Sequence, residues 1–169
     1  MAGRVDAELE TLIRARYPII YVVSWEEKRV EDTLRNIARE RGKKLHVWTI
    51  TQGFSTVSGQ RDNATRDPLA ALDHVIRSPD QAIFLLKDFH SFITDFNVTR
   101  RLRDLTLALK NSFKSLIILA PILKLPPELE KEVTILDFAL PGYEELGGLL
   151  DDIIRSVRDT PGVNVNLTA

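Results

Sequence analysis

Apolar residues along this chain fall into two alternating patterns, short continuous runs and longer stripes with helical spacing. The continuous runs are rich in β-branched residues, which is typical of strands buried on both faces of a parallel sheet. Five runs have this character: Ile19–Val23, Leu45–Ile50, Ala82–Leu86, Ser115–Ala120 and Val133–Phe138. Because such runs alternate with helical stripes, the pattern predicts a three-layer α/β domain with a five-stranded parallel sheet.

The helical stripes lie between and around the predicted strands. Their apolar spacing predicts helices over Val5–Arg16, Trp25–Arg41, Asp67–Arg77, Asn97–Lys110 and Tyr143–Arg158. Asp67 followed by proline marks a helix start. In the last helix the residues expected to face inward are Leu146, Leu149, Leu150, Ile153 and Ile154. The polar stretch Gly53–Arg66 is predicted to be a long loop.

The composition of the chain adds to this prediction only by excluding certain classes of protein and of site. The 169 residues carry a net charge of −1, whereas a general nucleic-acid binder would usually be basic. Without cysteine the chain has no disulfide, no cysteine-based zinc site and no thiol catalysis. Neither a membrane-spanning apolar run nor a signal peptide is visible, so the simplest expectation is a cytoplasmic protein with no membrane contact.

The connection after the first predicted strand should carry the phosphate-binding loop if the chain were a P-loop enzyme. That loop needs glycines and a lysine, but here no glycine occurs until Gly42. Ser24 with Glu27 three residues later predicts a capping box at the helix start. Glu26 and Glu27 would place carboxylates at the end of the helix that attracts anions. We therefore expect an ordinary helix start here and no bound nucleotide.

The end of the third predicted strand is the other place where nucleotide chemistry is expected. A metal-holding acid pair normally follows an apolar strand of this kind. Lys87 stands at the first of these positions and Asp88 at the second, with His90 close behind. Asp88 could still bind a cation and His90 could act as a base. A structural role for both is the simpler interpretation, and we predict no catalytic residue and no metal site.

A basic cluster opens the helix that follows. Arg100, Arg101 and Arg103 could contact phosphates or the carboxylates of a partner, while a solvated helix face is the simpler reading. Beyond the last helix, Pro161-Gly162 precedes an alternating stretch in which Val163 and Val165 are separated by asparagines. We expect one domain over residues 1–160 and a linker over 161–169 that leads toward further chain.

Several segments resemble the core of AAA+ ATPases. AIFLLKDFHSF (82–92) resembles a degraded Walker B strand, LIILAPILKLPPEL (116–129) a sensor-1 strand, and VTILDFALPGYEEL (133–146) the fifth strand with its helix start. The opening LETLIRARYPIIYVVSWEEKRVEDTL resembles the degenerate N-terminal module of the hypothetical chloroplast-reading-frame AAA ATPases of cyanobacteria and plastids. The resemblance covers nearly the whole chain. It implies that the five strands lie in the spatial order 5-1-4-3-2.

The family's catalytic residues do not carry over to this chain. No residue matches the Walker A lysine, and Ala120-Pro121 stands where a polar sensor-1 residue would be. The resemblance therefore implies a non-enzymatic module without a cofactor of its own, with ATP and Mg²⁺ confined to a downstream ATPase domain that it packs against or regulates. It also leaves room for a homo-oligomer.

Two other functions remain open at this point. One is an atypical nucleotide-binding or hydrolytic domain that uses Asp88 and His90. The other is a nucleic-acid-binding module that uses Arg100, Arg101 and Arg103, although the net charge makes nucleic acid an unlikely partner.

Overall fold

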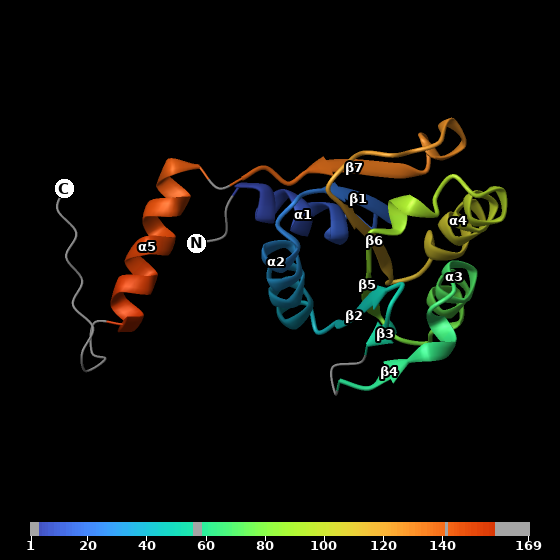
Figure 1. Cartoon of the computed structure of the whole chain (residues 1–169), viewed down its shortest axis with the longest axis horizontal. Coiled ribbons are helices and arrows are strands. Elements are labelled where there is room, and N and C mark those ends of the chain that lie inside the picture. The colour runs from blue at the N-terminus through green and yellow to red at the C-terminus, as the bar shows by residue number, and fades with distance from the viewer. Residues whose placement is uncertain (1–3, 56–58, 141, 158–169) are drawn as a thin grey trace.

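The computed structural model describes residues 4–55, 59–140 and 142–157, which form a sheet with helices on both faces (Figure 1). The sheet has the strand order β4-β3-β2-β5-β6-β1-β7. The strands are β1 Ile19–Val23, β2 Lys44–Thr49, β3 Gly53–Ser55, β4 Arg61–Asp62, β5 Ala82–Lys87, β6 Ser115–Ala120 and β7 Val133–Asp137. The α/β class predicted from the alternating pattern is confirmed.

The five predicted strands correspond to β1, β2, β5, β6 and β7. They lie in the expected order, with β7 beside β1, then β6, β5 and β2. All four pairings among them are parallel. In β1, β5 and β6 almost every residue is buried, because helices cover both faces. Continuous apolar runs are therefore the sequence pattern that this part of the sheet requires.

The prediction of a five-stranded, wholly parallel sheet was wrong, because two short antiparallel strands extend it. The predicted loop Gly53–Arg66 contains β3 and β4, and β3 pairs antiparallel with both β2 and β4. Gly53 adopts φ +68°, and a Cβ atom there would lie 2.0 Å from the carbonyl oxygen of Asp62. The glycine that suggested a loop is thus needed where two strands approach closely.

Four helices enclose the sheet. Figure 1 shows α1 (Arg4–Arg14) and α2 (Glu27–Glu40) on one face, and α3 (Pro68–Arg77) and α4 (Phe96–Leu109) on the other. Each pair buries an apolar stripe against its own face, which produces two core clusters. Short 3₁₀ turns occur at Asn63–Thr65 (η1), Phe89–Ser91 (η2) and Pro127–Leu129 (η3). The three-layer architecture therefore follows from amphipathic helices packed on a doubly buried sheet.

Carboxylate caps fix the starts of α3 and α4. The Asp67 carboxylate accepts a hydrogen bond from the backbone N–H of Ala70 at 3.0 Å, as the sequence predicted. Asp95 plays the same part for α4 and accepts from two backbone N–H groups. α4 therefore begins one residue earlier than expected, at Phe96.

The start of α2 differs from the prediction. The helix begins at Glu27 rather than Trp25, and no side chain caps it. The Ser24 backbone N–H instead donates to the carbonyl oxygen of Ala120 at 2.9 Å, which prolongs the pairing of β1 with β6. The Ser24 hydroxyl accepts a hydrogen bond from the Glu26 backbone N–H at 3.0 Å. The predicted capping box was wrong because strand pairing holds Ser24 outside the helix.

The last helix, α5 (Tyr143–Val157), stands apart from the sheet (Figure 1). Leu146, Leu150 and Ile153 were expected to face inward but are 52%, 45% and 58% exposed. Ile154 is half-buried. The Leu149 side chain and the predicted linker 161–169 lie outside the described residues. The amphipathic pattern correctly indicated a helix, yet the part of the chain described here supplies no surface that covers its apolar stripe.

Candidate functional site

The carboxyl edge of the parallel strands is where α/β domains bind ligands, and it brings together most of the predicted site residues. β1 ends at Val23, which is in register with Ala120 of β6 and with Asp137 of β7. Lys87 ends β5 and is in register with Leu119 of β6. The positions that resemble Walker A and Walker B thus belong to strands separated only by β6.

The connection between β1 and α2 consists of three residues, Ser24, Trp25 and Glu26. Ser24 is buried, and its backbone and hydroxyl are both hydrogen-bonded within the connection and to β6. Trp25 is 79% exposed. The Glu26 carboxylate lies 2.6 Å from a guanidinium nitrogen of Arg29. These contacts hold the connection close to the sheet and place the Glu26 carboxylate at the start of the helix.

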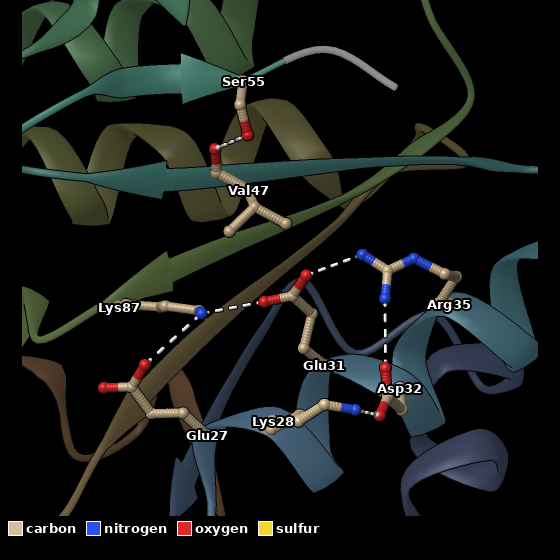
Figure 2. Close-up of polar contacts among 8 residues, drawn as sticks. All are labelled: Glu27, Lys28, Glu31, Asp32, Arg35, Val47, Ser55 and Lys87. Carbon is tan, nitrogen blue, oxygen red and sulfur yellow. Dashed lines mark hydrogen bonds and ion pairs between the residues drawn. The ribbon is translucent and has the colours of Figure 1, made fainter. Parts of the chain in front are cut away.

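Lys87 extends from β5 toward the first two turns of α2. Its ammonium nitrogen lies 2.8 Å from a carboxylate oxygen of Glu31 and 3.3 Å from one of Glu27. The Glu31 carboxylate also lies 2.6 Å from a guanidinium nitrogen of Arg35. Figure 2 shows Lys87 between the two glutamates. A cation at the strand end therefore pairs with anions at the helix start.

The pairing continues along the outside of α2. Arg35 lies 3.1 Å from a carboxylate oxygen of Asp32, whose other oxygen is 2.9 Å from the ammonium of Lys28 (Figure 2). We call the six residues of alternating charge the Lys87 network: Glu27, Lys28, Glu31, Asp32, Arg35 and Lys87. Exposure differs strongly within it. The Lys87 and Glu31 side chains are 16% and 20% exposed, whereas that of Lys28 is 91% exposed.

Burial and ion pairing shift the pKa values of Lys87 and Glu31, the two least exposed residues of the network, in opposite directions. Burial alone would lower the pKa of Lys87, but hydrogen bonds and charges from Glu31 and Glu27 outweigh it and raise that pKa. Burial alone would raise the pKa of Glu31, but the hydrogen bonds from Lys87 and Arg35 lower it below its usual range. Both groups are therefore held in their charged forms at neutral pH.

Asp88 and His90, the residues of the alternative catalytic site, follow Lys87 directly. Asp88 adopts the left-handed conformation at φ +55°, and its side chain is 58% exposed. The His90 Nδ1 atom lies 3.9 Å from a carboxylate oxygen of Asp88 and is buried without a hydrogen-bond partner. The described residues contain no cluster of three or more His, Cys, Asp or Glu side chains that could hold a metal ion.

Tyr21 ties the loop after β6 to the same edge of the sheet. Its hydroxyl donates to the carbonyl oxygen of Ile122 at 2.7 Å and accepts from the Lys124 backbone N–H at 3.3 Å. Burial raises the pKa of Tyr21, and the nearby negative charge of Asp88 adds to that effect. The loop is thus held in place while its apolar side chains Ile122 and Leu123 remain about half exposed.

The three arginines of the basic cluster lie on α4, and each has a carboxylate partner within the chain. Arg100 pairs with Asp104 one turn along the same helix. The Arg101 Nε atom donates to Asp73 of α3 at 2.6 Å. Arg103 lies 3.9 Å from Glu132. Arg100 and Arg103 remain 56% and 44% exposed, so they are the members that retain surface for a partner.

The other two histidines pack in an aromatic cluster away from the carboxyl edge. His46 of β2 stacks on Phe84 with ring centroids 5.0 Å apart, and His74 of α3 stacks on Phe54 at 4.8 Å. His46 also lies 3.5 Å from a carboxylate oxygen of Asp80. Burial lowers the pKa of His46, which favours the neutral ring. Both rings therefore pack as parts of the aromatic cluster.

Sequence reasoning did not identify Glu31 and Arg35 as part of the site. The signal was present, because Glu27, Glu31 and Arg35 are four residues apart and therefore lie on one face of a helix. What the sequence could not show was that Lys87 reaches this face from a strand more than fifty residues away.

Comparison with known protein families extends this description. The model for the SpoVK-like AAA ATPase, N-terminal domain, matches residues 5–138 of the chain. An uncharacterized AAA domain-containing protein ycf46 from Trieres chinensis is 36% identical over 160 residues, which is 93% of this chain and 32% of that protein. The protein of the same description from Guillardia theta is 34% identical and covers 82% of this chain and 28% of that protein. The chain thus spans about a third of the length of these curated relatives.

Solved structures with low sequence identity share the fold. A DNA replication initiation factor superimposes with a TM-score of 0.55 at 10% identity, covering 93% of this chain and 52% of that one. A chain from the E. coli MS115-1 HORMA:CdnC:Trip13 complex gives a TM-score of 0.53 at 15% identity, covering 95% and 65%.

Within the described residues no helix is long and apolar enough to cross a membrane. The strand order and the match over residues 5–138 agree with the resemblance found in the sequence. The chain belongs to the family of SpoVK-like AAA ATPase N-terminal domains, and its relatives include the ycf46 proteins.

Proposed function

We propose that this domain is a non-catalytic AAA+-like module that packs against or regulates an active ATPase domain of the same longer protein. The observation that carries the proposal is the pairing of Lys87 with Glu27 and Glu31. In a P-loop ATPase the helix start after the first strand receives the phosphates, and an acid at the end of a nearby strand, which corresponds to β5 here, holds Mg²⁺. Here glutamates are at the helix start and a lysine is at the strand end.

This reversal of charge opposes nucleotide binding at both positions. A triphosphate approaching α2 would meet the carboxylates of Glu26, Glu27 and Glu31. Mg²⁺ approaching the end of β5 would meet the Lys87 ammonium, which is already satisfied by two carboxylates. Breaking those pairs would leave poorly solvated charges behind. These pairs support a structural role for the Lys87 network, in which charges of the chain itself take the place of a bound nucleotide and Mg²⁺.

A contact role for the same edge has independent support. Trp25 is 79% exposed, and Ile122 and Leu123 are 50% and 51% exposed in a loop that Tyr21 holds in place. Large exposed aromatic and aliphatic side chains in a fixed backbone are typical anchors of protein interfaces. The relatives are AAA domain-containing proteins about three times as long as this chain, so a further AAA domain in the same protein is the partner we propose.

A binding assay with the remainder of a relative tests this role. The segment of the Trieres chinensis protein beyond its match to this chain would be purified and titrated with the chain, and both affinity and ATP turnover would be measured. We expect Trp25→Ala to weaken binding about tenfold. Leu107→Ala is the matched control, because Leu107 is 64% exposed on α4 and should not alter binding. Equal affinity of wild type and Trp25→Ala would overturn this interface.

The alternative of a hydrolytic site at Asp88 and His90 has less support. Their closest side-chain approach, 3.9 Å, is too long for a hydrogen bond. The nucleic-acid alternative is weakened by the pairing of Arg100, Arg101 and Arg103 with carboxylates of the same chain.

A further inference from the structure

Two basic side chains meet at the amino edge of the sheet, the edge opposite the Lys87 network. Arg16 precedes β1, Lys43 precedes β2 and Phe113 comes just before β6, and these strands run in parallel, so all three residues lie where strands begin. The Arg16 guanidinium lies over the Phe113 ring, 4.3 Å from its centroid. The Lys43 ammonium donates to the Phe113 carbonyl oxygen at 2.6 Å. Phe113 therefore contacts both cations.

Neither cation has a carboxylate partner within the part of the chain that the structure describes. Burial lowers the pKa of Lys43, and the positive charge of nearby Arg16 lowers it further. Two like charges at one place destabilise each other unless an anion offsets them. Around the end of α2 the described carboxylates pair with other cations or remain exposed: Glu10 with Arg41, Asp80 with Lys44, and Glu40 without a partner. Arg16 and Lys43 thus lack a counter-ion.

The backbone at Arg16 indicates that its side chain has a use other than ending α1. α1 and α2 end in the same kind of turn, with Arg16 and Gly42 at equivalent positions in the backbone hydrogen bonding. Both residues have positive φ, +60° for Arg16 and +61° for Gly42. Glycine is the usual residue in such a turn, because a side chain disfavours this conformation. α2 follows this rule, whereas α1 keeps an arginine against it.

Cations near helix C-termini also have a structural explanation, because they offset the negative end of the helix dipole. Lys114 fits it, since its ammonium donates to the carbonyl oxygens of Val75 and Ile76 at the end of α3, both at 3.0 Å. Lys43 does not, since its hydrogen bond goes to Phe113 in the connection between α4 and β6. An ammonium group has three donors, so Lys43 retains donors for a ligand.

Exposed rings adjoin the two cations. Tyr17 is 43% exposed and Phe113 is 48% exposed. We call Arg16, Tyr17, Lys43 and Phe113 the amino-edge surface. An arginine and a lysine bind carboxylates through charge-assisted hydrogen bonds, and exposed rings beside them accept apolar side chains.

We propose that the amino-edge surface binds an acidic segment of a protein partner, in which carboxylates alternate with apolar residues. The chain as a whole carries a net charge of −1, which favours a protein over a nucleic acid as the partner. The proposal is independent of the role proposed for Trp25 and of nucleotide binding, because this surface lies at the other edge of the sheet.

Fluorescence anisotropy with a labelled peptide measures this binding. The probe is a synthetic peptide of repeated Asp-Glu-Leu units, and its control is the amide version with Asn-Gln-Leu units. At low salt the full chain should bind the acidic peptide at least about tenfold more tightly, and about 0.5 M salt should remove most of the difference, because charge attraction between exposed groups is screened. Equal binding of the two peptides at low salt would overturn the proposal.

Three variants locate the binding. Arg16→Gly should weaken binding of the acidic peptide about tenfold while the urea midpoint stays the same or rises, because glycine suits the turn. Lys43→Gln keeps an N–H donor and loses the charge, and it should weaken binding to a similar extent. Lys28→Gln is the matched control, because it removes one positive charge from a side chain that is 91% exposed at the other edge, and it should bind like wild type.

The stability of Arg16→Gly separates a binding role from a structural one. If this variant lost stability but bound the peptide as wild type does, Arg16 would serve the fold alone and the proposal would be wrong. The same conclusion would follow if Lys28→Gln weakened binding as much as Lys43→Gln, since the attraction would then depend only on net charge.

A single-stranded oligothymidylate tests the competing anionic partner, because cations beside aromatic rings also suit nucleic acid. An oligonucleotide with the same total charge as the peptide should bind more weakly than the acidic peptide does. Tighter binding of the oligonucleotide, lost in both Arg16→Gly and Lys43→Gln, would assign the amino-edge surface to nucleic acid and overturn the proposal.

Discussion

Replacing Lys87 with methionine tests the energetic role of the Lys87 network. Methionine keeps most of the side-chain length and removes the charge. The contact with Glu31 is 2.8 Å long between side chains that are 16% and 20% exposed, so we assign it the usual net value of a charged hydrogen bond, about 1.5–3 kcal/mol. The contact with Glu27, whose side chain is half exposed, adds at most about 0.5 kcal/mol after screening. The expected loss of unfolding free energy is about 2 kcal/mol.

Urea unfolding followed by tryptophan fluorescence measures this loss. For a denaturant slope of about 2 kcal/mol per molar, the midpoint should fall by about 1 M. Lys28→Met is the matched control, because Lys28 belongs to the same network but is 91% exposed, and it should cost less than about 0.5 kcal/mol. A double-mutant cycle with Glu31→Gln should show a coupling of about 1 kcal/mol. If Lys87→Met costs no more than Lys28→Met, the network does not hold β5 to α2.

The same pair predicts a pH dependence. The pKa of Glu31 is lowered in the folded state, so its contribution is complete above its ordinary value of about 4.3 and disappears as pH falls through the lower folded value. The pKa of Lys87 is raised, so its contribution is complete below its ordinary value of about 10.4 and is lost only as pH rises through the higher folded value. The difference between wild type and Lys87→Met should therefore stay constant from pH 6 to 9 and shrink toward pH 3.

Three further predictions concern single positions. Ser24→Ala should lower the free energy of unfolding by about 1 kcal/mol, because the buried hydroxyl accepts a backbone hydrogen bond. It should not change binding to the ATPase segment, and a loss of that binding at unchanged stability would contradict a purely structural role for Ser24. Gly53→Ala should cost roughly 3 kcal/mol in urea unfolding, against about 1 kcal/mol for Gly42→Ala, because both glycines have positive φ but only at Gly53 would the new methyl meet backbone atoms. The free energy of unfolding of the wild type should fall as pH drops below about 6.5 toward the lower folded pKa of His46, and His46→Phe should make this decrease shallower. If the two proteins lost stability in parallel as pH fell, titration of other groups would be the cause.

The positions of the central strands could be predicted because each has a local sequence signal, whereas their order was implied by the resemblance to AAA+ ATPases. A run such as Ala82–Leu86 is apolar throughout, and only a strand covered on both faces places such a run without exposing it. β3 and β4 carry no such signal. β3 has three residues and one large buried side chain, Phe54, so its position depends on pairing with β2 and on the hydrogen bond from the Phe54 backbone N–H to the Thr65 hydroxyl.

Only some residues of the candidate site could be predicted, and none of the contacts between them. Lys87 was recognisable from its place after an apolar strand, and Glu27 from its place at a helix start. Their meeting depends on the pairing of β5 with β6 and of β6 with β1, which brings the two ends together. The predicted capping role of Ser24 was wrong for a related reason, because its backbone pairs with Ala120 of β6 and this pairing holds it outside the helix. α5 shows the limit of periodicity, which predicts an apolar stripe but not what covers it.

Titration of the chain with Mg-ATP, followed by calorimetry at about 50 μM protein, tests the central claim most directly. The carboxylates of Glu27 and Glu31 and the paired ammonium of Lys87 predict no binding heat up to about 1 mM nucleotide. Wild type and Lys87→Met should give the same flat trace, because removing one charge does not create a phosphate-binding loop. A dissociation constant tighter than about 10 μM, roughly −7 kcal/mol, would contradict the account and show that this edge of the sheet still binds nucleotide.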